Sequence, residues 1–207
     1  LALEDKLTAL QTTLAKEKLS YHNVVLYDKD VSKALHLRKA GLGLLGNMVG
    51  DKKAVACIED TAVALEDLPS YIKEFTAIMK SYNQEVVYYA HAGAGELHLR
   101  PILNLKTKQG VSYFRSITTD VAHLVKKYKG SFSGEHGDGI VRSEFIPIVI
   151  GEKNYALLSV VKKAFDPNYI FNPGKITAPF KMDVSLRNDY KQDPPTINTA
   201  FNFDDSQ

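Results

Sequence analysis

Two short segments of this 207-residue sequence concentrate the side chains that could do chemistry. Residues 91–98 (HAGAGELH) carry a histidine at each end, with mostly small residues between them. In residues 131–139 (SFSGEHGDG), Glu135 and His136 are adjacent and are flanked by glycines. Imidazoles and carboxylates bind divalent metals, and imidazoles also exchange protons near neutral pH. These two segments therefore hold the side chains that could bind a metal ion or act as a base.

Residues 91–98 are predicted to form the end of a β-hairpin, because β-forming residues precede and follow the small residues. A two-residue turn at Ala94 and Gly95 would pair His91 directly with His98, with their Cβ atoms about 4.5–5.5 Å apart. Two imidazoles so placed can share one metal ion. The alternative is that the two histidines only pair across the strands and bond to the backbone.

In an extended strand, the adjacent side chains of Glu135 and His136 would point in opposite directions. The flanking glycines permit a turn that directs both side chains into one cavity. Glu135 could then complete a set of two histidines and one carboxylate, and His136 could act as a general base. A solvated glycine-rich turn is the alternative. A phosphate-binding loop is disfavoured because the Lys-Ser/Thr pair is missing.

The elements that must position these segments alternate between helices and strands. Apolar spacing predicts helices over residues 2–18, 30–45, 65–82, 111–128 and 152–165, and strands over 23–27, 54–59, 85–91 and 96–102. This order favours an α+β fold in which an antiparallel sheet packs with helices, a ferredoxin-like core, followed by a helical C-terminal subregion. We expect one domain over residues 1–177 and an extended tail or linker over residues 178–207.

The composition is that of a globular protein, with 44% hydrophobic and 24% charged residues. A net charge of +2 argues against nucleic acid or an anionic membrane as a partner. No stretch approaches the ~20 apolar residues of a membrane helix, so no transmembrane segment is expected. The lone cysteine, Cys57, lies in an apolar run and is predicted to be a core residue.

Three motifs, taken together in their order and spacing, resemble the C-terminal domain of the FAD-linked oxidases. That family includes the glycolate oxidase D subunit, D-lactate dehydrogenase and D-2-hydroxyglutarate dehydrogenase. The resemblance extends over about residues 20–177. The motifs are residues 90–101 (AHAGAGELHLRP), 133–142 (SGEHGDGIVR) and 165–176 (FDPNYIFNPGKI).

The resemblance implies that His91, His98 and Glu135 bind a divalent metal, zinc-like or manganese-like. The metal would hold the carboxylate and α-hydroxyl oxygens of a 2-hydroxy acid. It also implies that His136 takes the hydroxyl proton while hydride passes from the α-carbon to FAD. The expected activity is therefore that of a FAD-dependent 2-hydroxy-acid dehydrogenase.

Three further residues take roles by the same resemblance. Arg38 lies where family members place an arginine for the substrate carboxylate, and Arg142 is a second candidate for that role. A surface arginine is the alternative for both. Asn172, in the last motif, lies where the family approaches the isoalloxazine of the cofactor.

The hairpin departs from the common form of the family, which has Asp and Asn where this chain has Ala94 and Glu96. The extra carboxylate of Glu96 could join the metal or repel an acidic substrate. A threonine and a lysine that some 2-hydroxyglutarate enzymes place after the arginine have no clear match, and Leu42 stands near the first. The substrate is therefore left open among acids like D-lactate, glycolate and 2-hydroxyglutarate.

In this family an N-terminal domain holds most of the FAD, and residues 1–207 contain no dinucleotide fingerprint. We expect them to be a segment of a longer chain that is inactive alone. The hairpin and tail are most similar to large bacterial members, in which an iron–sulfur module follows the flavin unit. That module or another electron acceptor would be a partner. A cytoplasmic location is expected, with a peripheral position at the inner membrane as an alternative.

Two functions of other kinds stay open at this point. One is a free-standing metal-dependent hydrolase that uses His91, His98 and Glu135. The other is a non-catalytic domain that binds metal or a partner.

Overall fold

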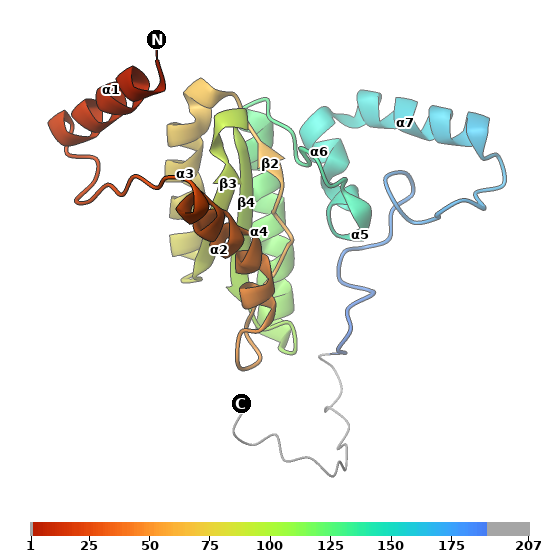
Figure 1. The fold of residues 1–207 in the computed structure, drawn as a ribbon. Helices are drawn as coiled ribbons and strands as arrows, with labels where there is room; N and C mark the ends of the chain where they lie inside the picture. Colours follow the sequence, from red (N-terminus) through yellow and green to blue (C-terminus); the bar gives the residue numbers. More distant parts are fainter. Residues whose placement is uncertain (1, 190–207) are drawn as a thin grey trace. The chain divides into compact units, whose positions relative to one another are not determined.

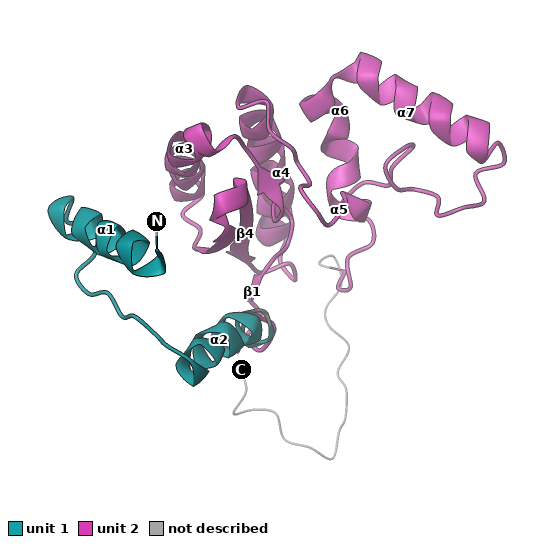
Figure 2. Ribbon diagram, turned by 45° about the horizontal axis from the view of Figure 1, so that its top comes forward, with its two compact units in different colours: residues 1–44 teal, residues 45–207 magenta. Residues whose placement is uncertain are grey.

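The computed structural model describes residues 2–189 of the chain. The chain divides into two compact units at residue 44, residues 1–44 and residues 45–207 (Figure 2). The first unit contains helix α1 (Leu3–Lys16) and most of helix α2 (Lys29–Gly46). Both helices lie within two residues of the predicted bounds. The strand predicted over residues 23–27 is wrong, because the described part of this unit has no second strand to bond its backbone groups.

The second unit is built on an antiparallel sheet of four short strands (Figure 1). Strand β4 (Glu96–Leu103) pairs with β3 (Val86–His91) along one edge, and with β1 (Lys53–Ala54) and β2 (Thr61–Ala62) along the other. A single antiparallel bridge joins Ala62 to Ser131 beyond β2.

Two long helices, α3 (Leu68–Ser81) and α4 (Lys108–Lys127), connect the strands of this sheet. Together with the bridge at Ser131, they give the βαββαβ order of ferredoxin-like folds. The predicted α+β class with an antiparallel sheet is confirmed. A short 3₁₀ helix, η1 (Leu65–Asp67), precedes α3.

The two faces of β4 differ sharply in chemistry. Leu97, Leu99 and Leu103 alternate along one face and lie in the core with buried side chains of α3 and α4, such as Phe75 and Phe114. Each fully buried side chain of this size contributes about 1.5–3 kcal/mol. In Figure 1, α3 and α4 lie together behind the sheet. Since side chains alternate along a strand, the polar residues of β4 lie on the opposite face.

The hairpin between β3 and β4 has a longer turn than predicted. His91 pairs with Glu96, and Tyr89 pairs with His98, so the predicted register is wrong. The turn contains a short 3₁₀ helix, η2 (Ala92–Ala94), and ends at Gly95. A type I′ turn needs positive φ at both central residues, whereas only Gly95, at φ 72°, has it here.

The strand predicted over residues 54–59 is interrupted. Ala54 pairs with Ile102 and Thr61 pairs with Leu97, so the segment from Ala54 to Thr61 is two residues longer than the part of β4 that it lies against. The two extra residues form a bulge. Asp60 lies in this bulge with φ at 79°. Cys57, just before it, is fully buried, as predicted.

A helical subregion follows the sheet, as predicted. It consists of α5 (Gly139–Arg142), η3 (Ser143–Phe145), α6 (Ile146–Ile150) and α7 (Glu152–Phe165). The three short helices before α7 were not predicted. None of the helices in the described part of the chain is long and apolar enough to cross a membrane.

The described part of the predicted tail, residues 178–189, contains no helix or strand but is anchored to the second unit. Met182 is buried, and its backbone N–H donates to the Glu144 carboxylate. The Asp183 carboxylate accepts two hydrogen bonds from Arg115 of α4. The remainder of that tail, residues 190–207, lies outside the described residues.

Arg115 joins three segments, because it also donates two hydrogen bonds to Glu144. Burial alone would raise the pKa of Glu144, but Arg115 outweighs it, and hydrogen bonding to Arg115 lowers the pKa of Asp183. A carboxylate whose pKa falls on folding stabilises the fold above its unfolded pKa and loses this effect as pH falls through its folded pKa. Arg115→Gln should therefore lower the free energy of unfolding by roughly 1–2 kcal/mol at pH 7, since the pairs are partly exposed.

Urea unfolding at pH 7 and at pH 3 measures this effect. The difference in free energy of unfolding between Arg115→Gln and the parent chain should be smaller at pH 3, where the carboxylates begin to take up protons. Lys127→Gln is the matched control, because its ion pair with Glu74 is exposed and should contribute little. If Arg115→Gln lowered the free energy of unfolding equally at both pH values, the ion pairs of Arg115 with Glu144 and Asp183 would not be the source of the stabilisation.

Candidate functional site

The polar face of the hairpin carries a cluster of three titratable side chains. His91, Glu96 and His98 share this face, because His91 is directly opposite Glu96, and His98 follows two residues later on the same strand. His98 is 2% exposed and lies between two rings. Its imidazole stacks on Tyr89 at 4.5 Å and on His136 at 5.4 Å between centroids.

Glu135 lies among three imidazoles. Its Oε1 is 3.7 Å from His91 Nε2, 3.6 Å from His98 Nε2 and 3.2 Å from His136 Nε2. The structure therefore brings together four of the predicted site residues. The cluster has a buried floor at His98 and a rim at His91, Glu135 and His136, whose side chains are 44–47% exposed.

A buried carboxylate, that of Asp60, holds the Glu135–His136 turn in place. It accepts hydrogen bonds from Ser133 Oγ at 2.5 Å and from the backbone N–H groups of Glu135 and His136, both at 2.8 Å. Burial alone would raise the pKa of Asp60, but these hydrogen bonds outweigh it and lower the pKa to about 2. Asp60 is therefore charged at neutral pH and fixes the direction in which both side chains leave the turn.

Arg142 supports the same turn from its other end. It is 5% exposed, and its guanidinium donates to the backbone carbonyls of Glu59 and Gly137. Its Nη2 also lies 3.6 Å from Asp60 Oδ2. These contacts explain why an arginine is buried here. A further role with the substrate carboxylate stays a prediction.

Glu59 is a functional candidate that the sequence analysis missed. Its Oε1 is 3.3 Å from His136 Nδ1, and its carboxylate also accepts a hydrogen bond from Arg100. A possible signal was present, since Glu59 and Asp60 directly follow the apolar run that ends at Ile58. Two acidic residues next to a buried segment are unusual, because carboxylates are seldom buried without partners.

The cluster fits a divalent metal ion. Buried polar atoms are nearly always hydrogen-bonded, yet Glu96 Oε1 has no partner among the described residues. Burial lowers the pKa of His98, which favours the neutral imidazole that binds metals. The Nε2–Oε1 distances to Glu135 are within a few tenths of an ångström of the ~3.4 Å between tetrahedral ligands at about 2.1 Å from a metal.

Glu96 adds a second carboxyl group to the cluster. Its pKa is raised to about 7, first by burial and then by the neighbouring carboxylates of Asp60 and Glu135. Together with His91, His98 and Glu135, it offers four donor atoms that all lie within 4.8 Å of one another. A divalent cation would relieve the repulsion between these carboxylates.

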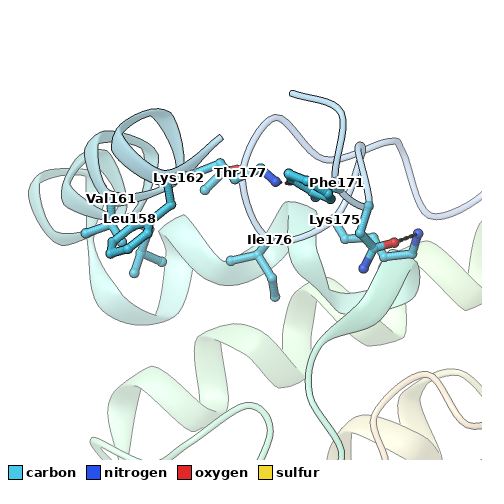
Figure 3. Close-up of a pocket in the computed structure, with 9 residues that line it drawn as sticks. Leu158, Val161, Lys162, Phe171, Lys175, Ile176 and Thr177 are labelled. Carbon is cyan, nitrogen blue, oxygen red and sulfur yellow. Dashed lines mark hydrogen bonds between the residues drawn. The ribbon is translucent and has the colours of Figure 1, made fainter. Parts of the chain in front are cut away.

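Arg38 belongs to the first unit, and Asn172 lies outside this cluster in the second unit. Arg38 is exposed on α2 in the first unit, so its expected role stays a prediction. Asn172 has a left-handed backbone, with φ at 50°, and its side chain accepts a hydrogen bond from Lys175. Asn172 lines a hollow of about 420 Å³ beside α7, drawn in Figure 3, and none of the cluster residues lines it.

Comparison with known proteins identifies similar sequences along most of the chain. The family described as FAD linked oxidases, C-terminal domain, matches residues 3–176. D-2-hydroxyglutarate dehydrogenase of Pseudomonas putida is 39% identical over 170 residues, which cover 82% of this chain and 17% of that protein. The protein of the same name from Escherichia coli is 40% identical over 156 residues, 75% of this chain and 15% of that protein.

A more distant relative is glycolate oxidase subunit GlcD of Bacillus subtilis. It is 24% identical over 141 residues, which cover 68% of this chain and 29% of that protein. The chain therefore spans about a sixth of the first two relatives and under a third of this one.

Replacement of Asp60 tests its role in holding the turn. Asp60→Asn should lower the free energy of unfolding by about 2–4 kcal/mol, because it removes a charge-assisted acceptor and the carboxylate that pairs with buried Arg142. Urea unfolding measures this loss. Asp138→Asn is the matched control, since Asp138 Oδ1 is buried without a hydrogen bond and its replacement should cost less than about 1 kcal/mol. Equal stability of the two variants would show that the Asp60 contacts do not hold the turn.

Proposed function

Because the chain belongs to the family of FAD-linked oxidase C-terminal domains, we propose that it supplies the substrate side of a flavin-dependent 2-hydroxy-acid dehydrogenase. The observation that carries this proposal is the convergence of His91, His98, Glu135 and His136 on one face of the hairpin. In the reaction, the substrate's α-carbon gives a hydride to FAD and its hydroxyl gives a proton to the protein, leaving a 2-oxo acid.

His91, His98 and Glu135 would hold the divalent ion, zinc-like or manganese-like. When bound, the ion would supply Lewis-acid stabilisation to the carboxylate and hydroxyl oxygens of the substrate. The half-exposed rim supports this proposal, because it leaves the ligands within reach of a small acid from solvent.

His136 would be the general base. Its Nδ1 faces Glu59, whose carboxylate can accept a hydrogen bond from a protonated Nδ1. This hydrogen bond would favour the neutral imidazole with its lone pair on Nε2. Nε2 in turn lies 3.2 Å from Glu135 Oε1, beside the metal ligands, where a bound hydroxyl would be within reach. Glu59 is a positioning residue in this account, and its own carboxylate is held by Arg100.

FAD would be held mainly by a preceding N-terminal domain, with Asn172 near its ring system. Arg38 and Arg142 remain candidates for the substrate carboxylate. Arg142 is the weaker of the two, because its guanidinium already bonds two backbone carbonyls. The open rim of the cluster fits a site that another domain completes.

The similarity to relatives about six times longer than the matched segment supports a place in a large protein of this kind. An iron–sulfur module as electron acceptor, a cytoplasmic location and peripheral contact with the inner membrane remain parts of this proposal. The family match favours a dehydrogenase over a free-standing metal hydrolase or a non-catalytic domain.

Anaerobic flavin reduction in the full-length protein tests the proposed activity. A panel of D-lactate, glycolate and D-2-hydroxyglutarate should contain at least one acid that bleaches the flavin absorbance. His136→Gln should slow this reduction by about 10²–10⁴-fold, the contribution typical of a general base. His123→Gln is the matched control, because His123 is exposed on α4 and away from the cluster.

Failure of every 2-hydroxy acid to reduce the flavin would overturn the substrate class. Reduction of the His136→Gln variant at the parent rate would remove His136 from the role of base and leave the substrate class standing.

A further inference from the structure

Glu96 stands at the centre of the cluster without a role in the proposed reaction. It is the first residue of β4, directly opposite His91 in the register and two residues before His98. Its Oε1 is 3.9 Å from His98 Nε2, and its carboxylate lies within 4.8 Å of the donor atoms of His91 and Glu135. The Glu96 carboxylate thus lies next to the donor atoms of the three expected metal ligands.

The carboxylate of Glu96 is buried beside the carboxylates of Asp60 and Glu135, and one of its two oxygens has no hydrogen-bond partner among the described residues. The residue is 8% exposed, and Oε1 has no hydrogen-bond partner within residues 2–189. The nearby guanidinium groups are engaged elsewhere, Arg100 with Glu59 and Arg142 with Asp60 and the backbone. Carboxylates buried next to one another repel, and no arginine or lysine among the described residues pairs with Glu96, so a bound cation would stabilise this group.

We propose that Glu96 is a fourth protein ligand of the metal, and that the resulting site of two imidazoles and two carboxylates favours a six-coordinate ion such as Mn²⁺ over Zn²⁺. The inference rests on the proposed metal site and adds to it a ligand and a metal preference. Carboxylate ligands suit Mn²⁺, whereas zinc is most often four-coordinate.

The number of ligands also bears on the substrate. Four protein ligands would fill a tetrahedral zinc site and leave no position for the substrate. In a six-coordinate site they leave two positions, which matches the two oxygens that a 2-hydroxy acid presents through its carboxylate and hydroxyl. The extra carboxylate is therefore compatible with catalysis only if the ion accepts more than four ligands.

Metal titration of the full-length, metal-free protein tests this inference. Isothermal titration with Mn²⁺ and separately with Zn²⁺ should give one site per chain. Glu96→Gln, which keeps the shape and removes the charge, should weaken Mn²⁺ binding by at least about tenfold and should affect Zn²⁺ binding less. Glu135→Gln should weaken binding of both ions. Glu85→Gln, an exposed carboxylate near the start of the same hairpin, is the control and should bind as the parent does.

Thermal unfolding distinguishes a ligand from a structural residue. In metal-free protein, Glu96→Gln should raise Tm, because it removes the repulsion between Glu96 and the neighbouring carboxylates of Asp60 and Glu135. The same variant should gain less Tm than the parent when Mn²⁺ is added. A structural role would instead lower Tm in the metal-free state, and a variant that fails to fold would count against the proposal in the same way.

Other outcomes separate this inference from the proposed function. If the parent and Glu135→Gln differ in metal affinity but Glu96→Gln binds like the parent, Glu96 is not a ligand and the three-ligand site stands. If Glu96→Gln leaves metal affinity unchanged but tightens binding of the acid, Glu96 repels the substrate, and the inference is overturned. If the parent binds neither ion, the metal site and this inference both fail.

Discussion

The fully buried carboxylate of Asp60 connects the sheet to the turn that carries Glu135 and His136. It gathers a hydroxyl and two backbone N–H groups around one charge, in a place that water does not reach. Such hydrogen bonds are stronger than neutral ones and are expensive to break when buried. Because the turn is rich in glycine and has little regular structure of its own, its conformation depends on this anchor. The positions of Glu135 and His136 over the hairpin follow from it.

The other half of the site follows from the alternation of side chains in β4. Leucines on one face pack with α3 and α4, which leaves Glu96, His98 and Arg100 on the opposite face. The apolar core thus determines the direction in which the chemical groups point. Charged side chains are tolerated on this face because Glu59 pairs with Arg100, and because Glu135 and His136 of the turn contact His98 and Glu59. The site therefore combines a rigid strand with an anchored loop.

Much of this arrangement could be predicted from local sequence, even where details were wrong. The predicted register of the hairpin differs from the observed one by two residues, because Ala94 does not adopt the backbone that a tight turn needs. A shift by two preserves the face of each side chain, so His91 and His98 still lie together. The strand predicted over residues 23–27 failed for a different reason. Its composition favours a strand, but the described part of its unit offers no strand to pair with.

Asp60 and Glu59 could not be assigned from spacing, because they reach the turn from about 75 residues away in the sequence. They lie in a bulge that interrupts the expected strand, and only the pairing of β1 and β2 with β4 reveals it. Arg142 was predicted only as a candidate for the substrate carboxylate, and its contacts with the turn could not be predicted, since its partners are backbone carbonyls that no motif identifies. Local patterns predicted the residues that gather in the candidate site. The residues that hold them came from long-range contacts.

The most direct test of this account is anomalous diffraction from crystals of the full-length protein loaded with Mn²⁺. One anomalous peak is expected on the polar face of the hairpin, within bonding distance of His91, His98, Glu135 and Glu96, with the Glu135–His136 turn still bonded to Asp60. A peak elsewhere, or no peak at this cluster in metal-loaded crystals, would contradict the claim that the turn and the hairpin together form a metal centre.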